Sequence, residues 1–201
     1  MKNRWVRFVT LALLAAGPTL AGVPAKTSSK FAATTYREQV GRITVLVDGF
    51  HASLHAHDPY IPVPVAIGLE RRGLTISLTP ESFTLIDQEG NSYPAATHSE
   101  VQRRYTKREF DAALLGVWPL VLGQQFAISR EQPARFFPSP QGRTRIPRVE
   151  LAPFTWCRDV LYFPRPEAGL GGVLTLRVAG GGIPDPIDVR FQIPWRQKSS
   201  R

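Results

Sequence analysis

The stretch from residue 60 to residue 96 constrains the fold more than any other part of this chain. Apolar residues recur at every second position over 61–69 and again over 74–78. This spacing is typical of β-strands that bury one face. Gly73 follows the first run, and the Asp-Gln-Glu-Gly-Asn sequence at 87–91 has the residues that favour tight turns. The stretch therefore predicts three or four short strands joined as antiparallel hairpins.

Further strands are predicted on both sides of this stretch. Runs of the same kind lie at 40–50, 149–152, 158–163, 174–178 and 187–195. The first of these runs is almost continuously apolar, which predicts a central position in a sheet. About seven short strands with Gly and Pro turns predict a mainly β chain that folds as an immunoglobulin-like antiparallel β-sandwich.

Residues 98–148 do not follow the strand pattern, and they are expected to form a short helical and irregular insertion. Two Thr-x-x-Glu sequences, which start at Thr97 and Thr106, fit the capping box that begins a helix. They predict a short helix near 98–105 and another near 107–115 that ends at Gly116 and turns Phe110 toward the sandwich. Four prolines between residues 124 and 148 predict irregular structure there.

The first 21 residues have the features of a secretory signal peptide. Basic residues at Lys2, Arg4 and Arg7 precede an apolar run at 8–16, and small residues at 19–21 fit a cleavage site. The apolar run is too short to span a bilayer, and an uncleaved amphipathic anchor is the alternative. The sequence thus predicts export to the periplasm or secretion, with no transmembrane span in the mature form.

Composition divides the rest of the chain into a leader, a domain and a tail. Residues 22–38 are small, polar and basic, and they are expected to form a flexible leader to a sandwich domain at 39–196. A polar tail follows at 197–201. Cys157 is the one cysteine in the chain, so the domain must be stable without an internal disulfide. This thiol is expected to be buried beside Trp156.

Three segments carry a resemblance to a known family. They are VPVAIGLERRGLTISLTPESFTLIDQEGNSYPAA from residue 63, VLYFPRPEAGLGGVLTLRV from residue 160, and IDVRFQIP from residue 187. Together they resemble the telokin-like immunoglobulin-fold domains of exported bacterial proteins and lipoproteins of unknown function. The resemblance implies the sandwich fold and no particular activity, and it does not extend to the long segment 98–148.

A cluster of histidines is a candidate metal site. His51, His55 and His57 lie in one short segment, with Asp58 beside them. If residues 50–57 formed a strand, the three imidazoles would share one face and could hold Zn²⁺ or Cu²⁺. The alternative is a set of surface histidines on a loop, because zinc sites normally draw ligands from more than one segment.

The insertion is also a candidate interaction surface. Residues 98–148 hold nine basic and four acidic residues, with aromatic residues between them. Such a surface could bind an envelope protein or an anionic polymer. Export argues against nucleic acid, and the alternative is a solvated loop whose aromatics attach it to the sandwich. The candidate partner-binding residues are Arg103, Arg104, Lys107, Arg108, Arg135, Arg143 and Arg145.

The sequence favours a protein that is not an enzyme. It contains no phosphate-binding loop, no dinucleotide fingerprint and no nucleophile motif around Cys157. The expected function is therefore a non-catalytic binding or assembly module of the bacterial envelope that needs no cofactor. A periplasmic Zn- or Cu-binding protein that uses the three histidines is one alternative, and an enzyme is another.

Overall fold

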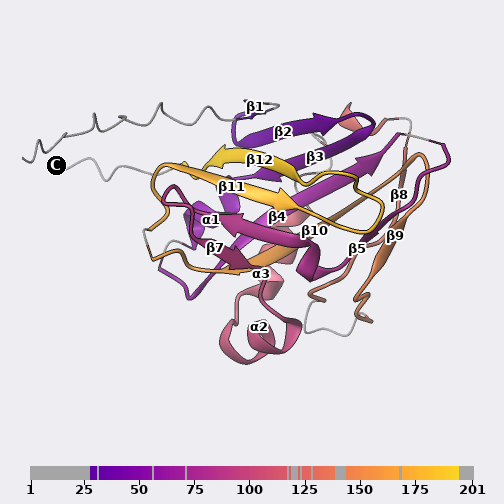
Figure 1. Ribbon diagram of the computed structural model, residues 1–201. Coiled ribbons are helices and arrows are strands. Elements are labelled where there is room, and N and C mark those ends of the chain that lie inside the picture. Colours follow the sequence, from indigo (N-terminus) through magenta and orange to yellow (C-terminus); the bar gives the residue numbers. More distant parts are fainter. Residues whose placement is uncertain are drawn as a thin grey trace, which may run out of the picture.

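Two β-sheets face each other in the body of the protein (Figure 1). The computed structural model describes residues 28–194 apart from 31, 56, 71, 117, 119–121, 123, 128, 139–143 and 168. The larger sheet has six strands in the order β1 (Ser29–Lys30), β2 (Thr35–Val40), β3 (Ile43–Asp48), β4 (Tyr60–Leu69), β10 (Thr155–Pro164) and β8 (Arg130–Glu131). Its pairs are antiparallel except β10–β8, which is parallel.

The second sheet and the shorter elements complete the architecture. The second sheet has the order β12 (Ile187–Gln192), β11 (Val173–Val178), β6 (Phe83–Ile86) and β7 (Ser92–Pro94). A separate pair joins β5 (Ile76–Leu78) to β9 (Val149–Leu151). Helices with described bounds are α1 (Phe50–Leu54), α2 (His98–Arg104) and α3 (Arg108–Leu115), and a 3-10 turn lies at Pro80–Ser82.

The main core lies between the two sheets. Strands β4 and β10 are ten residues long and pair along their whole length, from Leu69 with Thr155 to Tyr60 with Pro164. Alternate residues of β4, such as Val63 and Ile67, belong to the core. Phe191 and other apolar residues of β6, β11 and β12 belong to the same core. The mainly β antiparallel sandwich that the sequence predicts is confirmed.

A second, smaller core attaches the insertion to the outer face of the larger sheet. Its buried members are Leu46, Ala66, Trp118, Leu122, Phe126 and Trp156. The rings of Phe126 and Trp156 stack with their centroids 5.2 Å apart. A Cβ atom on Gly68 would lie 2.2 Å from the Phe126 ring, so only glycine permits this approach. Aromatic residues of the insertion thus pack against the sheet.

Several predicted elements are confirmed. The capping box at Thr97 forms, because its hydroxyl accepts the N–H of Glu100 and the Glu100 carboxylate accepts the N–H of Thr97. Helix α3 ends at Gly116 as predicted. The single cysteine, Cys157, is buried. Within the described residues, no helix is both long enough and apolar enough to cross a membrane.

Other predictions are wrong. The leader predicted over 22–38 overlaps β2, which pairs with β3 and buries Tyr36, so its last residues are ordered sheet. The strand predicted over 40–50 is a turn at residues 41–42, then β3, then the start of α1. Thr106 does not cap α3, whose N-cap is Lys107, and Phe110 is exposed rather than turned to the sandwich. The signal peptide, residues 22–27 and 31 of the leader, and the polar tail lie outside the described residues.

Candidate functional site

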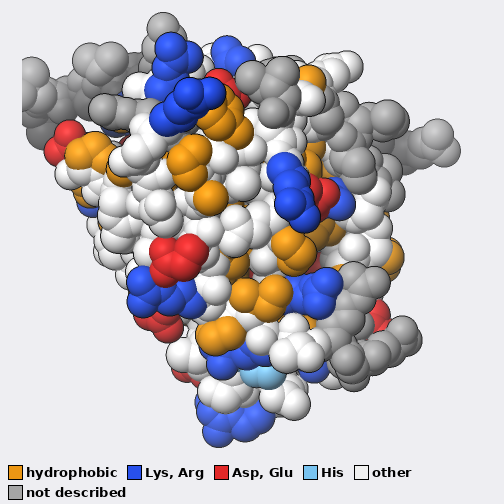
Figure 2. All heavy atoms as spheres, turned by 90° about the vertical axis from the view of Figure 1, so that its right-hand side faces the viewer, with side chains coloured by type: hydrophobic (Ala, Val, Ile, Leu, Met, Phe, Trp, Pro, Cys, Tyr) orange, Lys and Arg blue, Asp and Glu red, His pale blue; other side chains and the backbone are white. Residues whose placement is uncertain are grey.

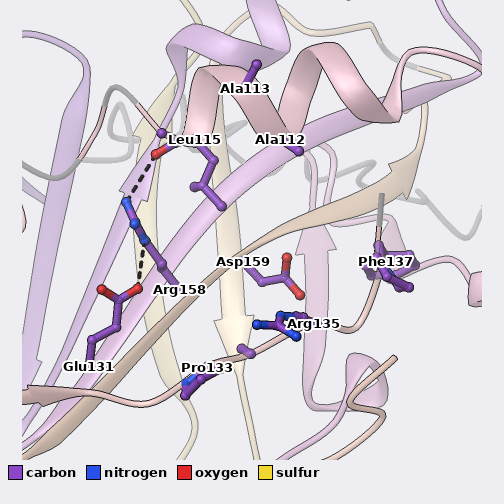
Figure 3. Close-up of a pocket in the computed structure, with 12 residues that line it drawn as sticks. Ala112, Ala113, Leu115, Glu131, Pro133, Arg135, Phe137, Arg158 and Asp159 are labelled. Atoms are coloured by element: carbon purple, nitrogen blue, oxygen red, sulfur yellow. Dashed lines mark hydrogen bonds and ion pairs between the residues drawn. The ribbon is translucent and has the colours of Figure 1, made fainter. Parts of the chain in front are cut away.

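A groove beside α3 has a volume of about 780 Å³ (Figure 3). The end of α3 forms one wall, the segment 131–138 forms the opposite wall, and β10 contributes Arg158 and Asp159. Ala112 and Ala113 keep the α3 wall open because their side chains are small and exposed. Two of these three elements come from the predicted insertion, and the sandwich supplies the third.

Arg158 links the two walls of the groove. Its Nε donates to Oε1 of Glu131 at 3.0 Å, and its Nη1 donates to the carbonyl oxygen of Leu115 at 3.1 Å. The second bond satisfies one of the carbonyl groups that a helix leaves without an internal partner at its C-terminal end. Figure 3 shows both bonds. Arg158 therefore serves to hold the end of α3 and the end of β8 at a fixed separation.

Asp159 holds the segment 131–138, which forms the opposite wall of the groove. Its Oδ2 accepts the backbone N–H of Phe136 at 2.6 Å, and its Oδ1 accepts that of Val160 at 2.8 Å. Burial raises the pKa of Asp159 to about 7, although these backbone hydrogen bonds and the charge of Arg135 act in the opposite direction. The Asp159 carboxyl at the floor of the groove thus becomes negatively charged as the pH rises through neutrality.

Arg135 differs from Arg158 in that its guanidinium makes no hydrogen bond or ion pair with the described residues. Its side chain lines the groove and points toward Asp159 in Figure 3. Its guanidinium makes no hydrogen bond or ion pair in the part of the chain that the structure describes. A guanidinium carries five N–H donors in a planar fork. The donors of Arg135 are therefore available to a ligand in the groove.

A buried charge cluster attaches the insertion to the sandwich at the other face of α3. Nε2 of His55 lies 3.0 Å from Oδ1 of Asp111, and Nδ1 of His55 lies 2.7 Å from Oδ2 of Asp58. Both His55 and Asp111 are buried. The hydroxyl groups of Tyr105 and Tyr162 donate to Oδ2 of Asp111 at 2.7 and 3.2 Å. The imidazole thus lies between two carboxylates, one from α3 and one from the loop before β4.

The two carboxylates favour the charged form of His55. Burial alone would lower the pKa of His55, but the close contacts with the carboxylates of Asp111 and Asp58, including the hydrogen bond to Asp58, outweigh burial and raise this pKa. Lys107 donates to both carboxylate oxygens of Asp58, at 2.8 and 3.0 Å, and so completes a chain of alternating charges. This cluster fixes α3 on the sheet and thereby sets the position of one groove wall.

The structure does not bring the three histidines together. The strand on which the metal prediction depended is not formed, because residues 50–54 are helix α1. His51 and His55 are buried, and His57 is exposed. His55 is engaged by Asp58 and Asp111, whereas both ring nitrogens of His51 lack a hydrogen-bond partner among the described residues. Among the described residues, no group of three or more His, Cys, Asp or Glu side chains could hold a metal ion.

The unpartnered imidazole of His51 leads to a prediction about stability. Nδ1 of His51 lies 3.8 Å from Oδ2 of Asp48, which is too far for a hydrogen bond. Replacement of His51 by leucine should raise the free energy of unfolding by about 1–2 kcal/mol, because it removes a buried polar group that has no partner. Urea denaturation measures the change, with the exposed His57→Leu as the control. A less stable His51→Leu protein would contradict this reading of the site.

The candidate basic residues are dispersed rather than gathered. Arg103 and Arg104 are exposed at the end of α2, Arg145 is exposed, Lys107 pairs with Asp58, and Arg108 is buried. Arg143 lies outside the described residues. On the face shown in Figure 2, basic side chains form several separate groups with uncharged surface between them. Of the described members of the predicted set, Arg135 lines the groove.

Sequence reasoning missed the acidic residues that organise the site. Asp111 was counted only as one of the acids of the insertion, yet it is fully buried and joins α3 to His55. Asp159 lies in a strand that is otherwise largely apolar, and such an interruption can mark a carboxylate with a structural or binding role.

Comparison with known proteins gives no relative: no protein-family description, no curated protein and no solved structure matches this chain.

Proposed function

We propose that this chain is an exported, non-catalytic binding module of the bacterial envelope, and that the groove beside α3 receives its ligand. The signal-peptide features of residues 1–21 support export. The groove supports binding, because a cavity of about 780 Å³ with apolar walls and a few charged groups has the size and composition of ligand sites.

The groove carries this proposal, and the way it is built adds support. Its two walls belong to the insertion, and both are anchored to the sandwich by buried contacts: α3 through Asp111 and His55, and the opposite wall through Asp159. Binding sites are commonly formed by loops on a rigid framework, since the framework limits the entropy lost on binding. Among the described charged groups of the groove, the Arg135 guanidinium makes no hydrogen bond or ion pair, and it favours an anionic ligand, such as an acidic segment of an envelope protein or an anionic polymer.

No matching observation supports the alternatives. A metal-handling function would need three or more ligands at one point, and the described histidines do not provide them. The described groove residues include no Ser, Cys or His, and the Asp159 carboxylate already accepts the backbone N–H groups of Phe136 and Val160. The module is therefore proposed to bind rather than to catalyse.

A blocked groove tests this function. Poly-L-glutamate serves as the anionic probe, and isothermal titration calorimetry measures its affinity for the full chain. Ala112→Trp places a large side chain in the groove from an exposed helix position and should weaken binding at least about tenfold. Gln102→Trp, on the exposed face of α2, is the matched control and should leave the affinity unchanged.

Backbone amide chemical shifts provide the second measurement. Binding in the groove should shift the resonances of residues 112–116 and 133–138. Unchanged affinity in Ala112→Trp, or shifts confined to Arg103 and Arg104 at the end of α2, would contradict the proposed site.

A further inference from the structure

We infer that the ligand is anchored in the groove by a carboxylate group carried on an apolar body, and that the Arg135 guanidinium receives this carboxylate. This inference rests on the proposed function and specifies the ligand chemistry of the same groove. It follows from a comparison of the charged side chains in the groove. Three of them have hydrogen-bond or ion-pair partners, and Arg135 has none among the described residues.

Three of the four charged side chains in the groove already have partners. Arg158 donates to Glu131 and to the Leu115 carbonyl oxygen, so both members of that ion pair are engaged. Asp159 accepts backbone N–H groups from Phe136 and Val160. Arg135 is the exception in the described part of the chain, since its guanidinium has no hydrogen bond or ion pair. Its free donors are the strongest recognition element of the groove.

A carboxylate fits these donors better than a neutral group. Arginine binds carboxylates through two parallel N–H···O bonds, and charge-assisted bonds of this kind are about twice as strong as neutral ones. Partial burial of Arg135 between the two walls strengthens the attraction, because the local dielectric constant is lower than that of water. Asp159 attracts Arg135 electrostatically, but among the described residues the two side chains form no ion pair within 4.0 Å, so the N–H donors of Arg135 are not used by Asp159.

The groove walls determine the rest of the ligand. Leu115, Phe137 and Pro138 contribute apolar surface, and Ala112 and Ala113 leave room above it. An aliphatic or aromatic body would cover this surface once the carboxylate reached Arg135. Two sources provide such a group, a free organic acid and the C-terminal end of a peptide. Both share the chemistry of one carboxylate next to an apolar substituent.

The test compares acids with their neutral amides. N-acetyl-L-phenylalanine and 3-phenylpropanoate are titrated into the full chain by calorimetry, beside the corresponding primary amides. The two acids should bind at least about tenfold more tightly than the amides. Arg135→Gln keeps a polar side chain of similar length, and it should reduce this ratio to about one. Arg104→Gln, which removes an exposed charge from α2, should preserve the ratio.

Each outcome is decisive. Equal binding of acids and amides, if it is still lost in Ala112→Trp, would overturn the carboxylate inference and leave the groove as the binding site. Equal binding that Ala112→Trp does not affect would overturn the proposed function as well. No binding of either acid would overturn the inference. A preference for acids that persists in Arg135→Gln would also overturn it. Tighter binding of N-acetyl-Ala-Ala-Phe than of 3-phenylpropanoate would identify a peptide as the source, and equal binding would identify a free acid.

Discussion

Replacement of Asp111 by asparagine should lower the free energy of unfolding by about 3 kcal/mol. Asp111 is fully buried, and it is the carboxylate that lies next to Nε2 of His55. The asparagine side chain has nearly the same size but no charge, so the charged imidazole would lose one of its two compensating partners. Removal of one member of a buried ion pair is costly because the other member stays buried without compensation.

Urea denaturation followed by circular dichroism measures this loss, with Glu109→Gln as the matched control. Glu109 lies on the exposed side of the same helix, and its replacement should change the stability by less than about 0.5 kcal/mol. The double variant Asp111→Asn/His55→Gln should be more stable than the sum of the single effects predicts, because the two residues interact directly. A loss below about 1 kcal/mol for Asp111→Asn would mean that the cluster does not hold α3.

The stability of the folded protein should fall by about 2–4 kcal/mol between pH 5 and pH 8.5. Folding raises the pKa of Asp159 from 3.8 to about 7, so the folded state binds this proton more strongly than the unfolded state. The resulting stabilisation is complete below about pH 4 and is lost as the pH rises through 7. The raised pKa of His55 extends the loss to higher pH, because its contribution is complete below 6.5 and disappears as the imidazole loses its proton.

Other titratable groups change the stability outside the range from pH 5 to pH 8.5, or weakly oppose the fall within it. The lowered pKa values of Asp58, Glu81, Asp87 and Glu100 give stability that is lost only in acid, as the pH falls through those values. His98 opposes the trend below 6.5, because burial and the charges of Arg145 and Arg108 lower its pKa. Urea denaturation at a series of pH values measures the sum of these effects.

Two variants separate the contributions to the pH profile. Asp159→Asn should remove the fall between pH 4 and pH 7, and His55→Gln should remove the fall above 6.5. A profile that rises from pH 5 to pH 8.5 in the unmodified protein would contradict the assignment of these two groups.

Sequence reasoning located the strands in which every second residue is buried. In β11 and β12, alternate residues are buried between the sheets, so the apolar pattern of Leu174, Leu176 and Val178 records the structure directly. The start of α2 could also be predicted from the sequence, because the capping box at Thr97 is formed by residues that are close together in the chain. Asp87 also behaves as expected for a turn residue, since its Oδ1 accepts the N–H groups of Glu89 and Asn91.

The elements that sequence reasoning missed depend on contacts between distant segments. Strand β2 has the polar sequence TYREQV, and its place in the sheet comes from its pairing with β3. Helix α1 follows Gly49, where a Cβ atom would lie 2.4 Å from the Gln192 carbonyl oxygen of the opposite sheet. The groove joins residues near 112–116, 131–138 and 158–159, and no local pattern connects them. The basic character of Arg135 was visible, but its lack of a partner was not.

The pairing of β4 with β10 has a consequence for how the molecule folds. The whole segment from residue 70 to residue 154 lies between Leu69 and Thr155, which are partners at one end of this ladder. Closure of so long a loop has a large entropic cost before any contact compensates it, and proteins dominated by such contacts fold slowly. The apolar strand β4 would meanwhile remain unpaired on one edge as the chain emerges during synthesis. In a cell, this interval is when a chaperone would have the greatest effect on the yield of native protein.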